Sequence, residues 1–185
     1  YLDGAEELNS SNATLWGATK KLKLTGTWTS LISNLGNWNA DSRTLYITGT
    51  WTLPKNKDQS LGNNGVIVVA DGGTINIPNN SSLSVNNGGK IYVMKGGSIS
   101  GSGTLYFDGS GTSGYDYNAG TINISTFNVH GSSFYNVGTI TTSAFKNQTS
   151  GYPFINWGKL IVNGDMSTYN CPFYNGCYVK CSNEL

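Results

Sequence analysis

Charged side chains are scarce in this sequence. Asp, Glu, Lys and Arg make up 11% of the 185 residues, against about a quarter in an ordinary soluble domain. Acidic and basic residues nearly balance, giving a net charge of +1, and the nearest approach to a basic patch is the cluster of Lys20, Lys21 and Lys23. Nucleic-acid binding needs a more basic surface, so no nucleic-acid partner is expected.

Long apolar runs are missing as well. No run approaches the roughly 18 residues that a membrane-spanning helix requires, so no membrane insertion is expected. The chain begins at Tyr1, with neither a Met nor a charged-then-apolar leader. Such a start is typical of a processed or excised piece of a longer protein.

Residues that commonly carry catalysis are few and dispersed. The one histidine, His130, has no nucleophile motif to serve in a Ser–His–Asp or Cys–His site, so a turn position is its expected role. Of the ten acidic residues, only Asp108 and Asp116 are placed for a simple register to bring together, across a Gly-rich loop. They are the one candidate for a calcium site, but a solvated loop is favoured. No catalytic residue, metal or cofactor is expected.

The three cysteines lie close together near the C-terminus, at Cys171, Cys177 and Cys181. Their spacings match no zinc or redox motif. They predict either small buried strand residues or one local disulfide with a thiol left over.

Glycine, asparagine, serine and threonine take the place of charge, while Trp, Tyr and Phe reach 12%. This mixture is typical of many short strands joined by turns and not of disorder. The strands also repeat: Leu24–Thr29 (LTGTWT) returns 23 residues later as Ile47–Thr52 (ITGTWT), and two Gly-Gly turns follow at Gly72 and Gly96, 24 residues apart. A second motif, Tyr-Asn-x-Gly or a close variant, marks the other half, with Asn-to-Asn offsets of 18, 20 and 19 residues.

These repeats predict an all-β, parallel β-helix (β-solenoid) with coils of 18–24 residues. One such coil cannot bury an apolar face alone, but stacked coils bury a continuous interior. Alternation such as Thr74-Ile75-Asn76-Ile77 places Ile inside, glycines are expected to supply positive φ at the corners, and parallel crossovers favour a right-handed winding. An antiparallel sandwich fits the composition equally well but leaves the recurring motifs unexplained.

The repeats also divide the chain. Residues 1–20 are a candidate N-terminal cap, with a helical turn expected near residues 5–8. Residues 21–185 form the β-helix, as one domain: longer coils over 21–107, a loop over 108–116 and shorter coils over 117–185.

Equivalent residues of successive coils should stack as ladders along the axis. The repeats predict an aromatic stack of Phe134, Phe154 and Phe173. They also predict a structural amide ladder of Asn118, Asn136, Asn156 and Asn175.

Three tyrosines are the candidate ligand-binding residues: Tyr117, Tyr135 and Tyr174. Each of the last two follows a Phe, and neighbouring strand residues point to opposite sides, so one aromatic row should lie inside and the other outside. Trp28 and Trp51 share one repeat position, for which the core is favoured over an exposed sugar platform. An ice-binding type of Thr array is not expected, because the Thr rows are taken to break after two coils.

The strings of type F-Y-N-x-G-T-I in the second half, and the preceding stretch from Ile91 to Gly103, resemble the β-helical N-terminal region of LruC-domain-containing proteins. These are predicted surface or secreted proteins of Bacteroides-type bacteria. The resemblance covers about residues 44–185, and Tyr174 to Cys177 resembles the coil that closes that region. It implies an extracellular or bacterial cell-surface location, an uncharacterised role, and a C-terminal domain of the same full-length protein beyond this chain.

The patterns together predict a non-catalytic secreted or cell-surface β-helix module that acts as a spacer, an adhesin or a glycan-contacting scaffold. A purely structural stalk is expected instead if both aromatic rows are buried. The expected partners of the module are an extracellular polysaccharide or a host or surface protein. The alternative is a carbohydrate-active β-helix enzyme of the polysaccharide lyase or hydrolase type. That alternative requires Asp108 and Asp116 to cluster with a lysine in a groove.

Overall fold

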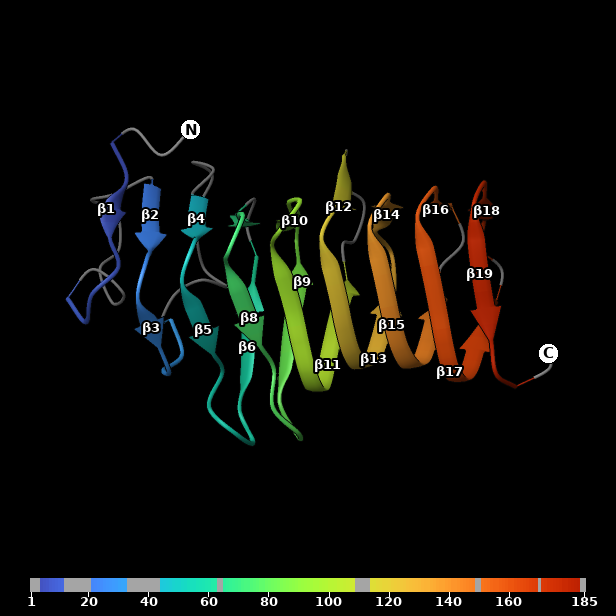
Figure 1. The fold of residues 1–185 in the computed structure, drawn as a ribbon, viewed down its shortest axis with the longest axis horizontal. Helices are drawn as coiled ribbons and strands as arrows, with labels where there is room; N and C mark the ends of the chain where they lie inside the picture. The colour runs from blue at the N-terminus through green and yellow to red at the C-terminus, as the bar shows by residue number, and fades with distance from the viewer. Residues whose placement is uncertain are drawn as a thin grey trace.

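The computed structural model describes residues 4–11, 21–32, 44–62, 65–108, 114–148, 151–169 and 171–183. Within these segments all regular secondary structure is β-strand, with no helix. The chain winds as a stack of coils from the N-terminal to the C-terminal end (Figure 1). The predicted all-β parallel β-solenoid is therefore confirmed.

The strands of the described residues pair in two sheets, and every pair is parallel. Sheet A has nine strands, which follow one another along the axis in chain order. They are β1 (Glu6–Glu7), β2 (Lys21–Leu24), β4 (Thr44–Ile47), β7 (Val66–Val69), β10 (Lys90–Val93), β12 (Tyr115–Asn118), β14 (Ser133–Asn136), β16 (Phe154–Asn156) and β18 (Phe173–Asn175).

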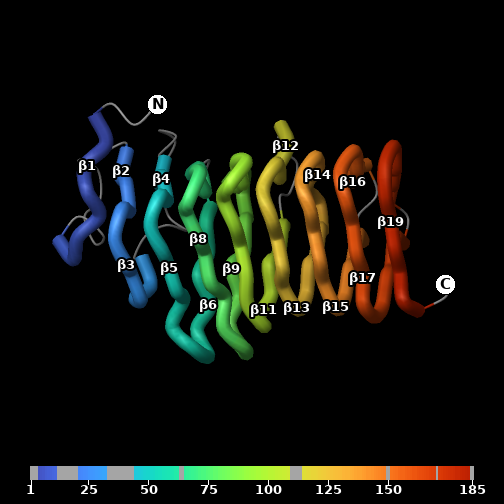
Figure 2. The backbone as a smooth tube through the Cα atoms, viewed as in Figure 1, coloured from blue at the N-terminus to red at the C-terminus, as the bar shows by residue number. Residues whose placement is uncertain are grey.

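Sheet B has ten strands among the described residues. They are β3 (Thr27–Trp28), β5 (Thr50–Thr52), β6 (Asp58–Leu61), β8 (Thr74–Asn76), β9 (Ser82–Asn86), β11 (Ser98–Asp108), β13 (Thr121–Val129), β15 (Thr139–Asn147), β17 (Lys159–Ser167) and β19 (Tyr178–Cys181). The long strand β11 pairs with both β8 and β9, and its register shifts between Gly101 and Thr104. The two short strands of the longer coils thus merge into one bent strand, which begins with β11 and continues in the shorter coils (Figure 2).

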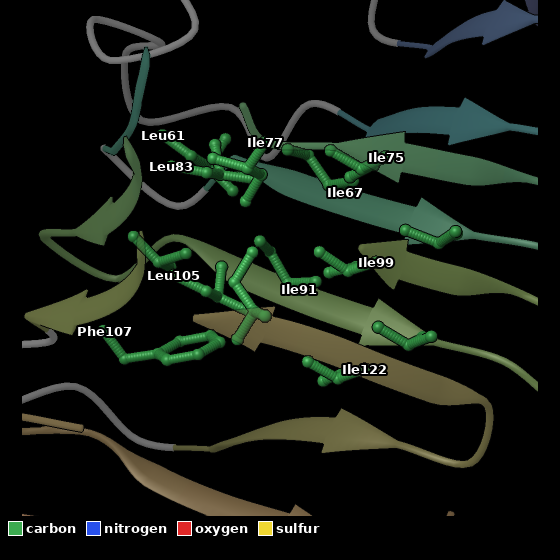
Figure 3. Packing of buried hydrophobic residues seen from close by; sticks show 14 of the residues in the cluster. Leu61, Ile67, Ile75, Ile77, Leu83, Ile91, Ile99, Leu105, Phe107 and Ile122 are labelled. Atoms are coloured by element: carbon green, nitrogen blue, oxygen red, sulfur yellow. The ribbon is translucent and has the colours of Figure 1, made fainter. Parts of the chain in front are cut away.

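The core lies between the two sheets, because alternate strand residues point inward. Trp51, Ile75, Ile99 and Ile122 share one register position in sheet B and have no exposed surface. Ile67 and Ile91 oppose them from sheet A, as Figure 3 shows. Successive longer coils therefore extend one apolar column.

Aromatic rings fill the core of the shorter coils. The ring of Phe154 stacks on Phe134 and on Phe173, each at a centroid distance of 5.5 Å with planes within 8° of parallel. Phe127 and Phe145 stack in the same way from sheet B, at 5.9 Å. The predicted Phe stack is confirmed.

The helical turn expected near residues 5–8 is wrong. Glu6–Glu7 is instead the strand β1, which pairs with β2, and the Leu8 N–H donates to the Lys23 carbonyl at 2.7 Å. A sheet edge offers a row of unpaired backbone groups, whereas one helical turn must overcome an unfavourable nucleation step. The rest of the candidate cap, residues 1–3 and 12–20, lies outside the described residues.

The expected loop over 108–116 is shorter than predicted. Asp108 ends β11, and β12 begins at Tyr115. Residues 109–113 lie outside the described residues.

The corner glycines act differently from the prediction. Gly72 and Gly96 do have positive φ, at 76° and 82°. Gly120, Gly138 and Gly158, however, are needed for space, because a Cβ at each would collide with the carbonyl oxygen of the glycine one coil earlier.

Candidate functional site

Asp116, one half of the candidate acidic pair, lies inside the solenoid with no exposed surface. It takes the register position between Ile91 and Phe134, where apolar side chains stand in neighbouring coils. Its carboxylate accepts hydrogen bonds from the Ile91 N–H at 2.8 Å and the Ser132 hydroxyl at 2.6 Å. Burial raises its pKa to about 6, against the lowering effects of Lys90 and these two hydrogen bonds.

Asp108, the other half of the pair, has a different partner. Its carboxylate lies 3.1 Å from the Nδ1 atom of His130, and both side chains are about two-fifths exposed, at 43% and 44%. The His130 ring stacks on Tyr106 at a centroid distance of 6.3 Å. Burial, and then the charge of Asp108, raise the pKa of the Tyr106 hydroxyl.

This arrangement gives no support to the lyase or hydrolase alternative. Asp116 and Lys90 are buried, at 0% and 8% exposure, so they do not line an open groove with Asp108. In the described part of the chain, no three His, Cys, Asp or Glu side chains gather where they could hold a metal ion. His130 lies in a bend directly after β13.

The predicted amide ladder runs through the corner between the two sheets. Each Asn Nδ2 donates to the Oδ1 of the Asn one coil further, at 2.8, 2.6 and 2.7 Å along the series Asn118, Asn136, Asn156 and Asn175. Each donor also reaches a backbone carbonyl, at 3.0–3.3 Å. The first three side chains have no exposed surface, so the ladder is a structural element and not a binding surface.

The three candidate tyrosines lie on the outer face of sheet A, as expected from their alternation with the inward Phe and Asn positions. They belong to a longer row with one residue per coil, which we call the outer row. It consists of Tyr46, Val68, Tyr92, Tyr117, Tyr135, Ile155 and Tyr174.

The rings of the outer row differ in how accessible their faces are. The Tyr117 and Tyr135 rings stack on each other at 6.2 Å and 16°, so each uses a face for its neighbour. Tyr174 is 60% exposed. It is therefore the most accessible ring of the three candidates.

Trp157 is a surface aromatic that the sequence did not single out. Its indole is 56% exposed and lies against the backbone of Gly176, where a Cβ would collide with the ring. One face of the indole therefore rests on the next coil. The sequence signal was its position directly after the ladder residue Asn156, which Val137 and Ala119 occupy in earlier coils.

Trp28 and Trp51 pair in register and point inward. Trp51 has no exposed surface, and its Nε1–H donates to the Ser30 carbonyl at 3.0 Å, while Trp28 is partly buried against the core. The preference for the core over a sugar platform is confirmed.

The outer face of sheet B carries rows of hydroxyl and amide groups, together with the rings of Tyr106 and Tyr178. One row continues over six coils, as Thr27, Thr50, Thr74, Ser98, Thr121 and Thr139. The expectation that the Thr rows break after two coils is therefore wrong for this row, whereas the neighbouring row passes from Thr52 to Asn76. The Gly-Gly pairs that suggested a break occupy the corner before β8 and β11, and the hydroxyl position follows them in register.

No disulfide joins the three cysteines, all of which lie in the described residues. Cys177 is exposed, and Cys171 and Cys181 are half-buried. Neither the expected burial nor the local disulfide is found.

Comparison with protein families, curated proteins and solved structures finds no match to this chain. No helix in the described residues is long and apolar enough to cross a membrane. The candidate site is therefore argued from its own geometry.

Proposed function

We propose that this chain is a non-catalytic, secreted or cell-surface scaffold that contacts glycans through the C-terminal half of the outer row. The observation that carries the proposal is the alignment of Tyr117, Tyr135 and Tyr174 in one register on the outside of sheet A. Trp157 lies beside this row, one corner position further along the chain.

The chemistry of this surface suits a neutral polysaccharide. Aromatic rings offer flat apolar faces for the C–H faces of sugars, and tyrosine adds a hydroxyl for hydrogen bonding. Successive coils repeat at the strand spacing of about 4.8 Å, so Tyr117 and Tyr135 lie one spacing apart. Tyr174 lies two spacings further along the axis, beyond Ile155. A chain with only 11% charged residues offers few ion pairs to an acidic polymer.

A polysaccharide array with the purified chain tests this proposal. We expect Trp157→Ala and Tyr174→Ala each to weaken binding about tenfold, the equivalent of roughly 1.4 kcal/mol. Thr141→Ala is the matched control, because Thr141 points outward from sheet B, away from the outer row. Tyr135→Ala should have a smaller effect, since its ring packs against Tyr117 and Tyr115.

Two results would contradict the proposal. The first is an absence of binding to any bacterial, plant or host polysaccharide by the folded chain. The second is a binding polysaccharide whose affinity falls equally in the Thr141→Ala control.

A further inference from the structure

A groove of about 620 Å³ crosses the outer face of sheet A in the longer coils. Its floor is the outward side of β7 and the residue that follows, with Val66, Val68 and Ala70. Tyr46 stands on one side, and Tyr92 and Met94 stand on the other. None of the candidate binding residues from the sequence lies in it.

The groove follows from side-chain size in three adjacent coils. Val68 pairs with Tyr46 on β4 and with Tyr92 on β10, so a short side chain separates two long ones. The two tyrosines stand two strand spacings apart, about 9.6 Å. Burial, followed by the charge of Asp116, raises the pKa of the Tyr92 hydroxyl, as expected of a half-enclosed wall.

We propose that this groove binds the alkyl chain of a free fatty acid. A volume of this size falls in the range of small-molecule sites, about 300–1,000 Å³, and the floor and most of the walls are apolar. The groove is only partly enclosed, which suits a single extended chain.

The backbone beneath the groove decides between ligand classes. Strand β7 is paired on both sides, with β4 and β10, so its N–H and C=O groups are already used. An extended peptide would bury its own backbone groups against Val68 without partners, and a sugar would do the same with its hydroxyls; polar groups buried without partners oppose binding. An alkyl chain has no such groups to leave unpaired.

The charges at one end of the groove favour a carboxylate head. Lys21 is exposed and pairs in register with Thr44, whose side chain also lines the groove. Lys90 flanks the other side of Val66, but it is buried and its ammonium donates to the Gly114 carbonyl at 3.4 Å. Lys23 also lies on this face, paired with Tyr46 midway along the groove wall. Lys21, level with Thr44 at the end of the groove, is the cation assigned to the carboxylate, and the methyl end would lie toward Met94.

Fluorescence of cis-parinaric acid, and its displacement by palmitate, measures this binding directly. Val68→Lys places a charge on the groove floor without entering the core, and we expect it to weaken binding at least tenfold. Ile155→Lys is the matched control, because Ile155 belongs to the same outer row but lies outside the groove; its affinity should equal that of the unmodified chain. Met94→Lys, at an exposed wall position, replaces Val68→Lys if the latter fails to fold by circular dichroism.

The head group is tested by comparing ligands of equal chain length. Lys21→Glu should weaken palmitate several-fold and leave hexadecanol unchanged. Phosphatidylcholine vesicles should show no binding, since the proposal is for a free acid and not a membrane surface.

The proposal is overturned if the folded chain shows no saturable binding of cis-parinaric acid. It is also overturned if Val68→Lys or Met94→Lys binds as tightly as Ile155→Lys, or if vesicles bind and palmitate does not. The polysaccharide array tests the C-terminal half of the outer row, whereas the fatty-acid assay tests the groove in the longer coils. Either proposal can therefore fail while the other stands.

Discussion

A single carboxylate interrupts the apolar core column of sheet A. Asp116 stands where Ile91 and Phe134 stand in the adjacent coils, at the boundary between the longer and shorter coils. The backbone pairing between β10 and β12 begins only at Tyr92 and Tyr117. One residue before this pairing, the Asp116 carboxylate accepts a hydrogen bond from the Ile91 N–H. Asp116 therefore supplies the acceptor that the backbone ladder lacks there, at the expense of burying a titratable group.

This burial makes stability depend on pH. The pKa of Asp116 rises from 3.8 to about 6 on folding, so the folded state holds the proton more tightly than the unfolded chain. The stability from this group is complete below pH 4 and is lost as the pH rises through 6. A shift of about two units corresponds to about 3 kcal/mol.

We therefore expect Asp116→Asn to flatten the pH dependence of unfolding. The amide can still accept from the Ile91 N–H and can donate to the Ser132 hydroxyl, but it carries no charge at any pH. Urea denaturation at pH 4 and pH 7 measures the effect as a difference in the free energy of unfolding. The variant should gain about 2.4 kcal/mol relative to the unmodified chain between these pH values; parallel pH profiles would contradict this account.

At the scale of the strand and its turn, the sequence was most informative where the repeat was strict. The alternation in Thr74-Ile75-Asn76 predicted the inward face, and the Asn-x-Gly spacing predicted the ladder through Asn136. The features that the sequence did not predict lie outside the repeats. The strand β1 has only two residues, too few for a periodic signal, and its conformation depends on the edge of β2 that it joins.

The site was predictable only in part, for the same reason. Tyr117, Tyr135 and Tyr174 share a local motif, so their common face could be read from the sequence. Tyr46 and Tyr92 lie in coils with a different motif, and only the register across Val68 places them in the outer row. The groove depends on this register, so the sequence alone did not show it.

The corner glycines give a prediction at the scale of the turn. Gly138 has no room for a Cβ, because the Gly120 carbonyl of the preceding coil occupies that space. Gly26 holds the same corner position in an earlier coil, with nothing within 4 Å of its Cβ site. Gly138→Ala should then lower the free energy of unfolding by about 2–3 kcal/mol through overpacking.

Gly26→Ala provides the control for this substitution. It should be neutral or stabilise the fold by up to about 1 kcal/mol, because alanine reduces the freedom of the unfolded chain. Chemical denaturation of both variants measures the difference. Equal destabilisation would mean that the corners require glycine for its backbone conformation and not for space.

At the scale of the whole molecule, the solenoid is a one-dimensional stack. In the described residues each coil bonds to the coil before and the coil after it (Figure 2). Among the described coils, one that lies between two others is held by two interfaces, and the coil of β18 and β19 is held by one. The same contact should therefore differ in stability with its position along the axis.

Two backbone hydrogen bonds of the same kind and the same length, one coil apart, allow this difference in stability to be measured. The Trp157 N–H donates to the Asn136 carbonyl at 2.8 Å, and the Gly176 N–H donates to the Asn156 carbonyl, also at 2.8 Å. The two hydrogen bonds lie one coil apart. Phe154, in the coil of the Trp157 amide, is fully buried, whereas Phe173, in the coil of the Gly176 amide, is only partly buried. Opening the last coil breaks one interface, so it should require less free energy than opening the coil before it.

Native-state hydrogen exchange should then show the Trp157 amide protected at least tenfold more than the Gly176 amide, after correction for intrinsic exchange rates. A tenfold ratio corresponds to about 1.4 kcal/mol. Equal protection would mean that the two coils open together, as one cooperative unit. In that case the Phe stack and the amide ladder, which both cross this boundary, bind the last coil as firmly as an interior one.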